Sequence, residues 1–310
     1  MSGRPRLLVT GGAGFVGANL VRRLGDRYDV RVLDSLVTGS KALLPPEVEL
    51  VVGDVRDPEA VADALTGADA VVHLAAAGSV VDSVADPFAN FDVNARGTLT
   101  VLDAARHAGV ERFVFASTGG ALVGNAPGPV DESSVPRPLS PYGAGKAAAE
   151  AYCSAYAGSY GLRTIALRFA NLYGPWSGHK RGVVTTFFRA LHAGRPMVVH
   201  GDGGATRDFL HVEDLCDALD RSLTADVPGG TTLHVATAVE TSIDELAALC
   251  AEVAGRPGHP VEHATTRTGE VERNVASYRL AEQVLGFRPT VSLRDGLAGT
   301  WSWYREHVFR

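Results

Sequence analysis

The chain has 310 residues, of which 45% are hydrophobic and 21% charged, so it is long enough to bury a complete core and is typical of a globular protein. The net charge of -6 leaves no concentrated basic surface, which argues against nucleic acid as a partner. The three cysteines lack the spacing of a zinc site and the even number of a disulfide framework, and indicate thiols in a reducing cytoplasm.

The first half of the chain alternates short apolar runs with segments of helix length. The first run follows two arginines and is far too short for a signal peptide or a membrane span, so a cytoplasmic protein without a membrane partner is expected. Strands separated by helices favour a parallel, doubly wound α/β sheet with right-handed crossovers. The runs that predict strands are Leu7–Thr10, Val30–Leu33, Val48–Val52, Ala70–Leu74, Phe113–Ser117 and Thr164–Phe169.

The second half is less regular and predicts a smaller C-terminal lobe woven around the first domain. Loop-rich stretches at 174–182, 200–207 and 226–231 separate helices expected near 183–193, 212–223 and 242–254. The doubly wound domain is assigned residues 1–172 and about 205–225, and the lobe mainly residues 173–204 and 226–310. Because no repeat or long linker is present, we expect one compact unit with a cleft between the two parts.

A glycine-rich turn follows the first predicted strand and opens a helix. Glycines in such a turn let the backbone approach a pyrophosphate, and the helix N-terminus faces its negative charge. This is the pattern of a Rossmann dinucleotide-binding domain, although a glycine-rich turn can also be purely structural. The candidate cofactor-binding residues of the turn are Gly11, Gly14, Phe15, Val16 and Gly17.

Asp34 ends the second predicted strand, at about the distance downstream where an acidic residue binds the adenosine ribose. Its carboxylate would repel a 2'-phosphate, so NAD is favoured over NADP as the cofactor. Asp54 and Val55 follow the third predicted strand and are expected near the adenine. In the alternative interpretation, each aspartate only caps a turn.

Tyr142 and Lys146 lie one turn apart at the start of a strongly helical stretch, so they share a helix face. An ammonium near a phenol lowers the phenol's pKa, and such a tyrosine can remove a hydroxyl proton while the carbon beneath it loses hydride. Thr118 ends a predicted strand, at the sheet edge where ligand-contacting groups collect, and can bridge substrate and phenolate. Taken alone, the tyrosine and lysine could also be an accidental surface pair.

Six motifs occur in order over nearly the whole chain, and together they resemble the extended short-chain dehydrogenases that act on nucleotide sugars. They are TGGAGFVG at 10–17, VVHLAA at 71–76, FASTGGA at 115–121, YGAGK at 142–146, LRFANLYGP at 167–175 and GDGGATRDFLHVEDL at 201–215. The resemblance implies that Tyr142 is the acid/base, that Lys146 orients the cofactor ribose and tunes the tyrosine, and that Thr118 contacts the reacting oxygen. The further NAD contacts that it implies are Leu74, Ala75, Ala76 and Asn94.

The same resemblance implies a set of substrate contacts in the second half of the chain. Asn171 and Arg207 match residues at the substrate diphosphate, although Arg207 could instead form a salt bridge with a neighbouring carboxylate. Arg267 resembles a second diphosphate contact, and Glu270 lies where the nucleoside ribose is expected. Homodimerisation through a two-helix face, which includes the helix after Tyr142, is expected by resemblance alone.

The family holds epimerases, dehydratases, decarboxylases and reductases, and the residues after Thr118 distinguish among them. Dehydratases of this type place Asp-Glu there and decarboxylases a nearby Glu, whereas this chain has Gly119–Ala121, which are all small. We therefore predict a UDP-sugar 4-epimerase that works by transient oxidation to a 4-keto sugar and hydride return. The alternatives are a nucleotide-sugar 4,6-dehydratase or reductase, or a non-catalytic NAD-sensing protein, which would need a lost acid/base group.

A cationic stretch at 179–181 lies where the family's loop borders the hexose. A 6-carboxylate would need a cation or hydroxyl donors there, and Arg181 is the best candidate, with Ser79 and Thr118 as further donors. UDP-glucuronate is therefore slightly favoured over UDP-glucose or UDP-galactose. Asn171 argues for the neutral sugar, because hexuronate epimerases more often have threonine there. In the alternative interpretation, the cationic stretch is only a solvated loop.

Overall fold

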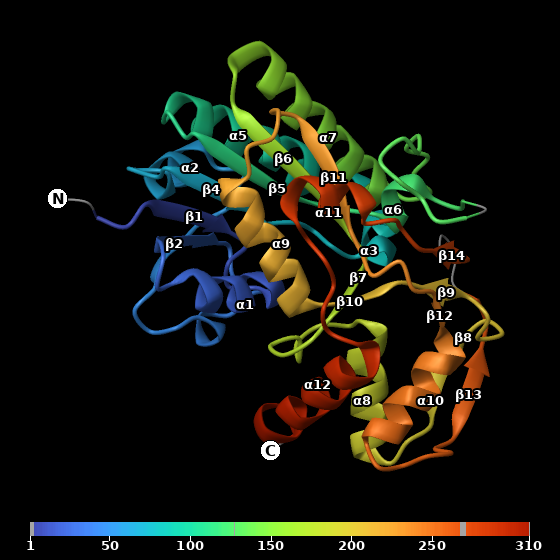
Figure 1. Ribbon diagram of the computed structural model, residues 1–310. Helices are drawn as coiled ribbons and strands as arrows, with labels where there is room; N and C mark the ends of the chain where they lie inside the picture. Colours follow the sequence, from blue (N-terminus) through green and yellow to red (C-terminus); the bar gives the residue numbers. More distant parts are fainter. Residues whose placement is uncertain (1–2, 127, 267–270, 310) are drawn as a thin grey trace.

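The computed structural model describes residues 3–126, 128–266 and 271–309. Its centre is a seven-stranded parallel sheet in the order β3-β2-β1-β4-β5-β6-β11, which confirms the predicted doubly wound α/β fold (Figure 1). The order reverses between β1 and β4, and ligands of such sheets bind outside the strands' carboxyl ends at that point. The strands are β1 (Arg6–Thr10), β2 (Asp29–Asp34), β3 (Glu49–Val52), β4 (Ala70–His73), β5 (Arg112–Thr118), β6 (Arg163–Phe169) and β11 (Thr231–Val235).

Helices cover both faces of the sheet, because successive side chains of each strand point to opposite sides. On β1, Leu7 and Val9 pack in the core that α1, α9 and α11 share, whereas Leu8 packs in the core formed with α2, α5 and α7. All three side chains are fully buried. The helices are α1 (Phe15–Leu24), α2 (Pro58–Ala64), α5 (Gly97–His107), α7 (Pro141–Tyr160), α9 (Val212–Thr224) and α11 (Arg279–Leu285).

The six predicted strands all occur, but the seventh, β11, comes from a stretch that the sequence assigns to a loop and to the smaller lobe. The predicted loop at 226–231 ends at Gly230, and Thr231 begins a strand that pairs with β6. The strand reads TTLHV, so its apolar residues are too few and too interrupted to form a run. Likewise, the predicted loop at 200–207 ends in the short strand β9 (Thr206–Arg207).

The smaller lobe, at the bottom of Figure 1, has an apolar core of its own. The helices predicted near 183–193 and 242–254 occur there, whereas the one near 212–223 is α9 and packs on the large sheet. The last helix was not predicted, although Leu297, Trp301 and Tyr304 recur at helical spacing and are buried. The elements of the lobe are α8 (Val183–Ala193), α10 (Ile243–Val253), α12 (Leu293–His307), β8 (Met197–His200) and β13 (Val261–Ala264).

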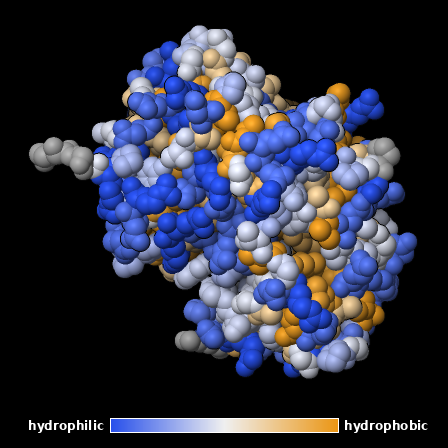
Figure 2. Space-filling model, viewed as in Figure 1, coloured by the Kyte–Doolittle hydropathy of each residue, from blue (hydrophilic) through white to orange (hydrophobic). Residues whose placement is uncertain are grey.

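Short strands join the two parts and bring Asn171 and Arg207 to the junction. β7 (Asn171–Tyr173) pairs with β10 (Phe209–His211), and β9 lies between β12 (Thr241–Ser242) and β14 (Arg273–Asn274). Figure 2 shows a mostly hydrophilic face, with apolar side chains gathered over the junction and the smaller lobe. Within the described ranges, no helix has the length and apolar character to cross a bilayer. The remaining helical elements are η1 (Lys41–Leu43), α3 (Val80–Ala85), α4 (Pro87–Phe91), η2 (Asp92–Arg96) and α6 (Gly120–Val123).

Candidate active site

The glycine-rich turn between β1 and α1 leaves an open, electropositive helix end. Gly11 has φ of +69°, and a Cβ there would meet the backbone nitrogen of Ala75 at 2.6 Å, so only glycine fits. Gly14 caps α1 without a side-chain hydrogen bond, which leaves the first backbone N–H groups of the helix available to an anion. Phe15 and Gly17 are buried in the first turn, and Val16 is half-buried. The turn therefore fits a dinucleotide pyrophosphate.

The predicted adenosine-side residues lie at the carboxyl ends of β2 and β3. Asp34 is buried, and its carboxylate accepts hydrogen bonds from the backbone nitrogens of Ala13 (2.9 Å) and Leu36 (2.8 Å). It therefore holds the glycine-rich turn against the β2 end. Asp54 forms an ion pair with Arg56 at 2.6 Å, and the hydrogen bond from this guanidinium lowers the pKa of the carboxyl. Val55 is buried beside them.

The segment after β4 lies directly opposite the glycine-rich turn. The backbone nitrogen of Leu74 donates to the Thr10 carbonyl (3.0 Å), and the Cα of Ala75 is among the atoms that a Cβ on Gly11 would meet. Ala76 follows and is half-buried. The buried Asn94 amide fixes this segment by bonding to both the nitrogen and the carbonyl of Ala77, at 2.9 and 3.1 Å. Direct contacts of these residues with the cofactor stay a prediction.

Tyr142, Lys146 and Thr118 converge at the ends of α7 and β5. Tyr142 is the second residue of α7, and its phenol is hydrogen-bonded to the Thr118 hydroxyl. Lys146, one turn later, is 2% exposed. Its Nζ donates to the Ala116 carbonyl at 2.7 Å and lies 4.7 Å from the centroid of the Phe115 ring. The three predicted catalytic residues are thus brought together.

Burial is the largest influence on the pKa values of this group. Burial raises the pKa of Tyr142 to about 12, and the Thr118 hydrogen bond opposes that rise. Burial also lowers the pKa of Lys146 to about 8, against the opposing charge of Glu150. At neutral pH the phenol is therefore protonated and most of the lysine is charged. A positive charge placed beside the phenol would bring its pKa back toward the working range.

Asn274 is a site residue that the sequence analysis missed. Its amide donates to the Asn171 side-chain oxygen at 3.4 Å, across 103 residues of sequence. A Cβ on Gly120 would overlap the Asn274 amide, so the two residues are in direct contact beyond Thr118. Asn274 belongs to no recognised motif. The pairing of β14 with β9 places it here, and the bridge between Val130 and Ala276 holds the same segment. Two uncharged amides therefore line this side of the site.

Of the other residues predicted to contact the substrate's diphosphate and ribose, the structure describes only Arg207. Arg207, on β9, donates to the backbone carbonyls of Thr206 (2.8 Å) and Glu272 (3.4 Å). These bonds hold its side chain at the junction of the two parts. Arg267 and Glu270 lie outside the described residues.

The cationic stretch at 179–181 turns a different residue inward from the one predicted. Arg181 is exposed just before α8. Lys180, although its side chain is exposed overall, lines a cavity of about 100 Å³ with Phe15 and Asn171, and burial of its ammonium lowers its pKa. Its Nζ lies 6.0 Å from the centroid of the Phe15 ring. Ser79 is also exposed, and its hydroxyl caps α3 by accepting from the Asp82 nitrogen at 3.1 Å.

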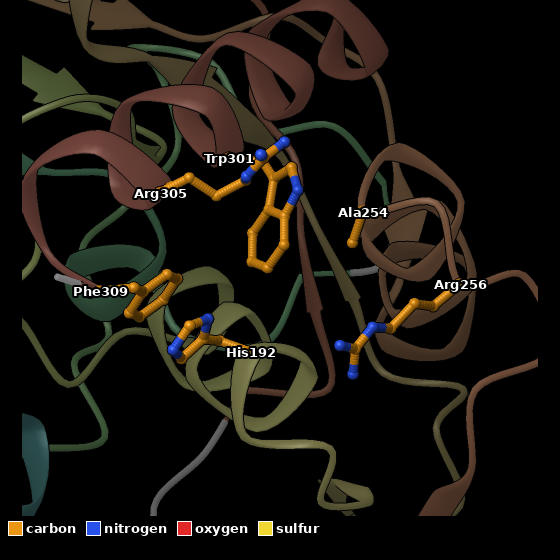
Figure 3. Close-up of a pocket in the computed structure, with 6 residues that line it drawn as sticks. All are labelled: His192, Ala254, Arg256, Trp301, Arg305 and Phe309. Atoms are coloured by element: carbon orange, nitrogen blue, oxygen red, sulfur yellow. The ribbon is translucent and has the colours of Figure 1, made fainter.

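A larger cavity, of about 280 Å³, lies in the smaller lobe and holds none of the predicted site residues (Figure 3). It opens where α8, α10 and α12 end, and Arg256 donates to the Leu191 carbonyl near the end of α8. Cations at helix C-termini offset the helix dipole, which accounts for the two arginines structurally. The lining residues are His192, Ala254, Arg256, Trp301, Arg305 and Phe309. Among the described residues, no cluster of His, Cys, Asp or Glu could hold a metal ion.

Comparison with known proteins finds similarity over nearly the whole chain. Residues 7–236 match the model of the NAD dependent epimerase/dehydratase family. A UDP-glucose 4-epimerase of Mycolicibacterium smegmatis is 39% identical over 97% of this chain and 98% of its own. A dTDP-glucose 4,6-dehydratase of Streptomyces niveus is 34% identical over 97% of this chain and 93% of its own. The structure of Thermus thermophilus UDP-glucose 4-epimerase in complex with NAD has a TM-score of 0.92 at 39% identity, covering 98% of this chain and 100% of that one.

Proposed function

This chain belongs to the NAD dependent epimerase/dehydratase family, and from that premise we propose that it is a UDP-sugar 4-epimerase. This family membership confirms the resemblance that the sequence motifs indicate, and it confirms the prediction that the cofactor is NAD. One observation carries the choice of reaction: Thr118 is followed by Gly119 and Gly120, and the neutral amide of Asn274 fills the space beside them. Removal of water from the sugar needs an acid and a base at that place, and these residues supply neither.

Bound NAD supplies a reversible hydride acceptor. In the proposed mechanism, Tyr142 removes the proton of the sugar's 4-hydroxyl as carbon 4 is oxidised, and Thr118 holds the same oxygen by a hydrogen bond. The charged Lys146 stabilises the phenolate from the next helical turn. The 4-keto sugar turns over beside Gly119 and Gly120, and the proton returns when carbon 4 is reduced on its other face.

We assign the neutral pair UDP-glucose and UDP-galactose as the first substrates. Asn171 and Asn274 offer uncharged hydrogen-bonding groups, which suit sugar hydroxyls without the cost of burying an ion. Arg181, the cation expected to pair with a 6-carboxylate, is exposed. These features reverse the slight preference for UDP-glucuronate that the sequence alone suggests.

UDP-glucuronate is retained as a second candidate because of Lys180. Its ammonium lines the same small cavity as Asn171, close to the glycine-rich turn. A carboxylate within reach of this group would form a charge-assisted hydrogen bond, which is stronger than a neutral one.

We also propose a homodimer that uses α7 and its neighbour α4. Large apolar side chains are exposed on this side of the domain, among them Phe88 (84%) and Phe91 (55%) on α4 and Tyr152 (41%) on α7. Burial of such a patch between two copies would remove it from water. Light scattering during size exclusion should give about twice the monomer mass, and Phe88→Ser with Phe91→Ser should reduce it.

One assay tests the reaction and the sugar together. The purified protein is incubated with UDP-glucose, UDP-galactose, UDP-glucuronate or dTDP-glucose, and the product stereochemistry is followed by NMR. We expect interconversion of UDP-glucose and UDP-galactose without net consumption of NAD. Formation of a 4-keto-6-deoxy sugar would instead identify a dehydratase, and turnover of UDP-glucuronate alone would identify the charged sugar as substrate.

A further inference from the structure

A row of polar residues crosses the sheet directly beneath the proposed catalytic group. Ser117 on β5 lies opposite Arg168 on β6, and Arg168 lies opposite His234 on β11. All three are buried, and each is the last residue but one of its strand. Ser117 immediately precedes Thr118, and His234 is the nearest side chain to the space beside Gly119.

Glu150 of α7 binds this row from the helix that carries Tyr142 and Lys146. One carboxylate oxygen accepts from the Ser117 hydroxyl at 2.5 Å and from Arg168 Nε at 2.9 Å. The other accepts from Arg168 Nη2 at 2.7 Å. Glu150 follows Lys146 by one helical turn, so the carboxylate and the ammonium share one face of α7.

Burying the charges of Arg168 and Glu150 costs free energy, which argues that these residues do more than stabilise the fold. The side chains of Arg168 and Glu150 are 7% and 8% exposed, and a buried ion pair is often no more stabilising than apolar residues of similar size. Moreover, Arg168 Nη1 has no hydrogen-bond partner within the described ranges. Burial lowers the pKa of His234 to about 4, so the ring next to the guanidinium is neutral.

We propose that Ser117, Glu150 and Arg168 form a positioning network that fixes Thr118 and Lys146 relative to each other. The inference rests on the proposed function, because it assigns the network to the same proton transfer. The network is linked to the reacting groups at two points. Ser117 is joined to Thr118 by one peptide bond, and Glu150 lies one turn of α7 from Lys146. Proton transfer depends steeply on such geometry, and a shift of about 1 Å can cost about 100-fold in rate.

The test replaces the ion pair by apolar residues in the full-length protein with NAD bound. The double variant Glu150→Met with Arg168→Met keeps side-chain volume and leaves no unpaired charge, so the fold should be retained. Ser117→Ala removes only the hydroxyl link. The matched control is Thr164→Val, because Thr164 makes another buried hydrogen bond between β6 and α7, to the Cys153 carbonyl at 2.8 Å, but lies away from Thr118.

We expect kcat for epimerisation to fall about 10- to 100-fold in the double variant and less in Ser117→Ala, with KM and bound NAD near wild type. Thr164→Val should lower the melting temperature and leave kcat unchanged. A double variant whose kcat stays within about twofold of wild type would overturn the proposal. Restoring Arg168 and Glu150 singly should not restore kcat, because each then lacks its partner.

A second readout does not depend on the substrate. Ultraviolet titration of the phenolate in the NAD-bound protein, with Tyr142→Phe subtracted, gives the pKa of Tyr142. Loss of the network should raise this pKa, because Lys146 would lose the Glu150 charge that favours its protonated form, and less positive charge would then stabilise the phenolate. If wild type epimerises no sugar, the proposed function fails and this titration alone decides the network. An unchanged pKa would then overturn it.

Discussion

The two ends of the proposed cleft are built in different ways. At the cofactor end, the residues lie in turns directly after β1, β2 and β4 or at the start of α7, and one parallel sheet holds them all. At the sugar end, they come from the short strands β7, β9 and β14 and from the loop at 174–182. Strand ends of a buried sheet are fixed by many backbone bonds, whereas loops adapt. Substitutions at the first end should therefore have larger effects than those at the second.

The largest effect is expected at the rigid end, from Tyr142→Phe. Loss of the phenolic hydroxyl removes the proposed acid/base, so kcat should fall by about two to four orders of magnitude while NAD affinity is retained. Steady-state kinetics and NAD titration measure the two quantities. Tyr160→Phe is the matched control, because Tyr160 is the last residue of the same helix and is exposed. Turnover near wild type in Tyr142→Phe would remove Tyr142 from the mechanism.

A smaller loss is expected from Asp34→Ala, also at the rigid end. The carboxylate is proposed to bind the adenosine ribose, and a hydrogen bond to a charged group is worth about 1.5–3 kcal/mol, or about 10- to 150-fold in the NAD dissociation constant. The preference for NAD over NADP should narrow, because the negative charge is gone. Asp34→Asn separates the two effects: it keeps an acceptor for Ala13 but removes the charge. An unchanged cofactor preference in both variants would contradict the assignment.

The sugar end should respond to Gly120→Ala by a change in KM. The new methyl group would overlap the Asn274 amide, and overpacking of this kind costs about 1–3 kcal/mol. Gly158→Ala is the matched control, because Gly158 also lies in a helix, away from the sugar, and a Cβ there would meet nothing within 4 Å. Adding Asn274→Ala to Gly120→Ala should relieve the overlap, so the two changes should not be additive. Equal KM values for both glycine variants would show that Asn274 does not border the sugar.

The same contrast explains what could be predicted from the sequence. The residues after β1 and β2 follow from local patterns, because a strand and the turn after it are neighbours in both sequence and space. Asn274 reaches Asn171 from β14, a two-residue strand that has no periodicity to read and pairs with the equally short β9. β11 was missed because polar residues interrupt its apolar pattern, and one of them, His234, lies in the buried polar row. Long-range pairing and buried polar residues are thus what the local patterns did not reveal.

The smallest effect is expected in the cationic stretch, where two adjacent residues can be compared directly. Lys180 lines the cavity with Asn171, whereas Arg181 is exposed. Lys180→Gln should therefore raise KM for the UDP-sugar, and Arg181→Gln should not. The effect should stay below the 1.5–3 kcal/mol of a full charged hydrogen bond, at about five- to tenfold, because solvent still screens the ammonium. Adding salt should weaken substrate binding by the wild type more than binding by Lys180→Gln.

The KM values for UDP-glucose and UDP-glucuronate then identify which group of the substrate Lys180 contacts. An equal rise for both sugars places it at the shared diphosphate, whereas a rise for UDP-glucuronate alone places it at the 6-carboxylate. A larger rise in KM from Arg181→Gln than from Lys180→Gln would identify Arg181 as the cation that binds the substrate, as the sequence predicts. It would also show that the loop rearranges when substrate binds.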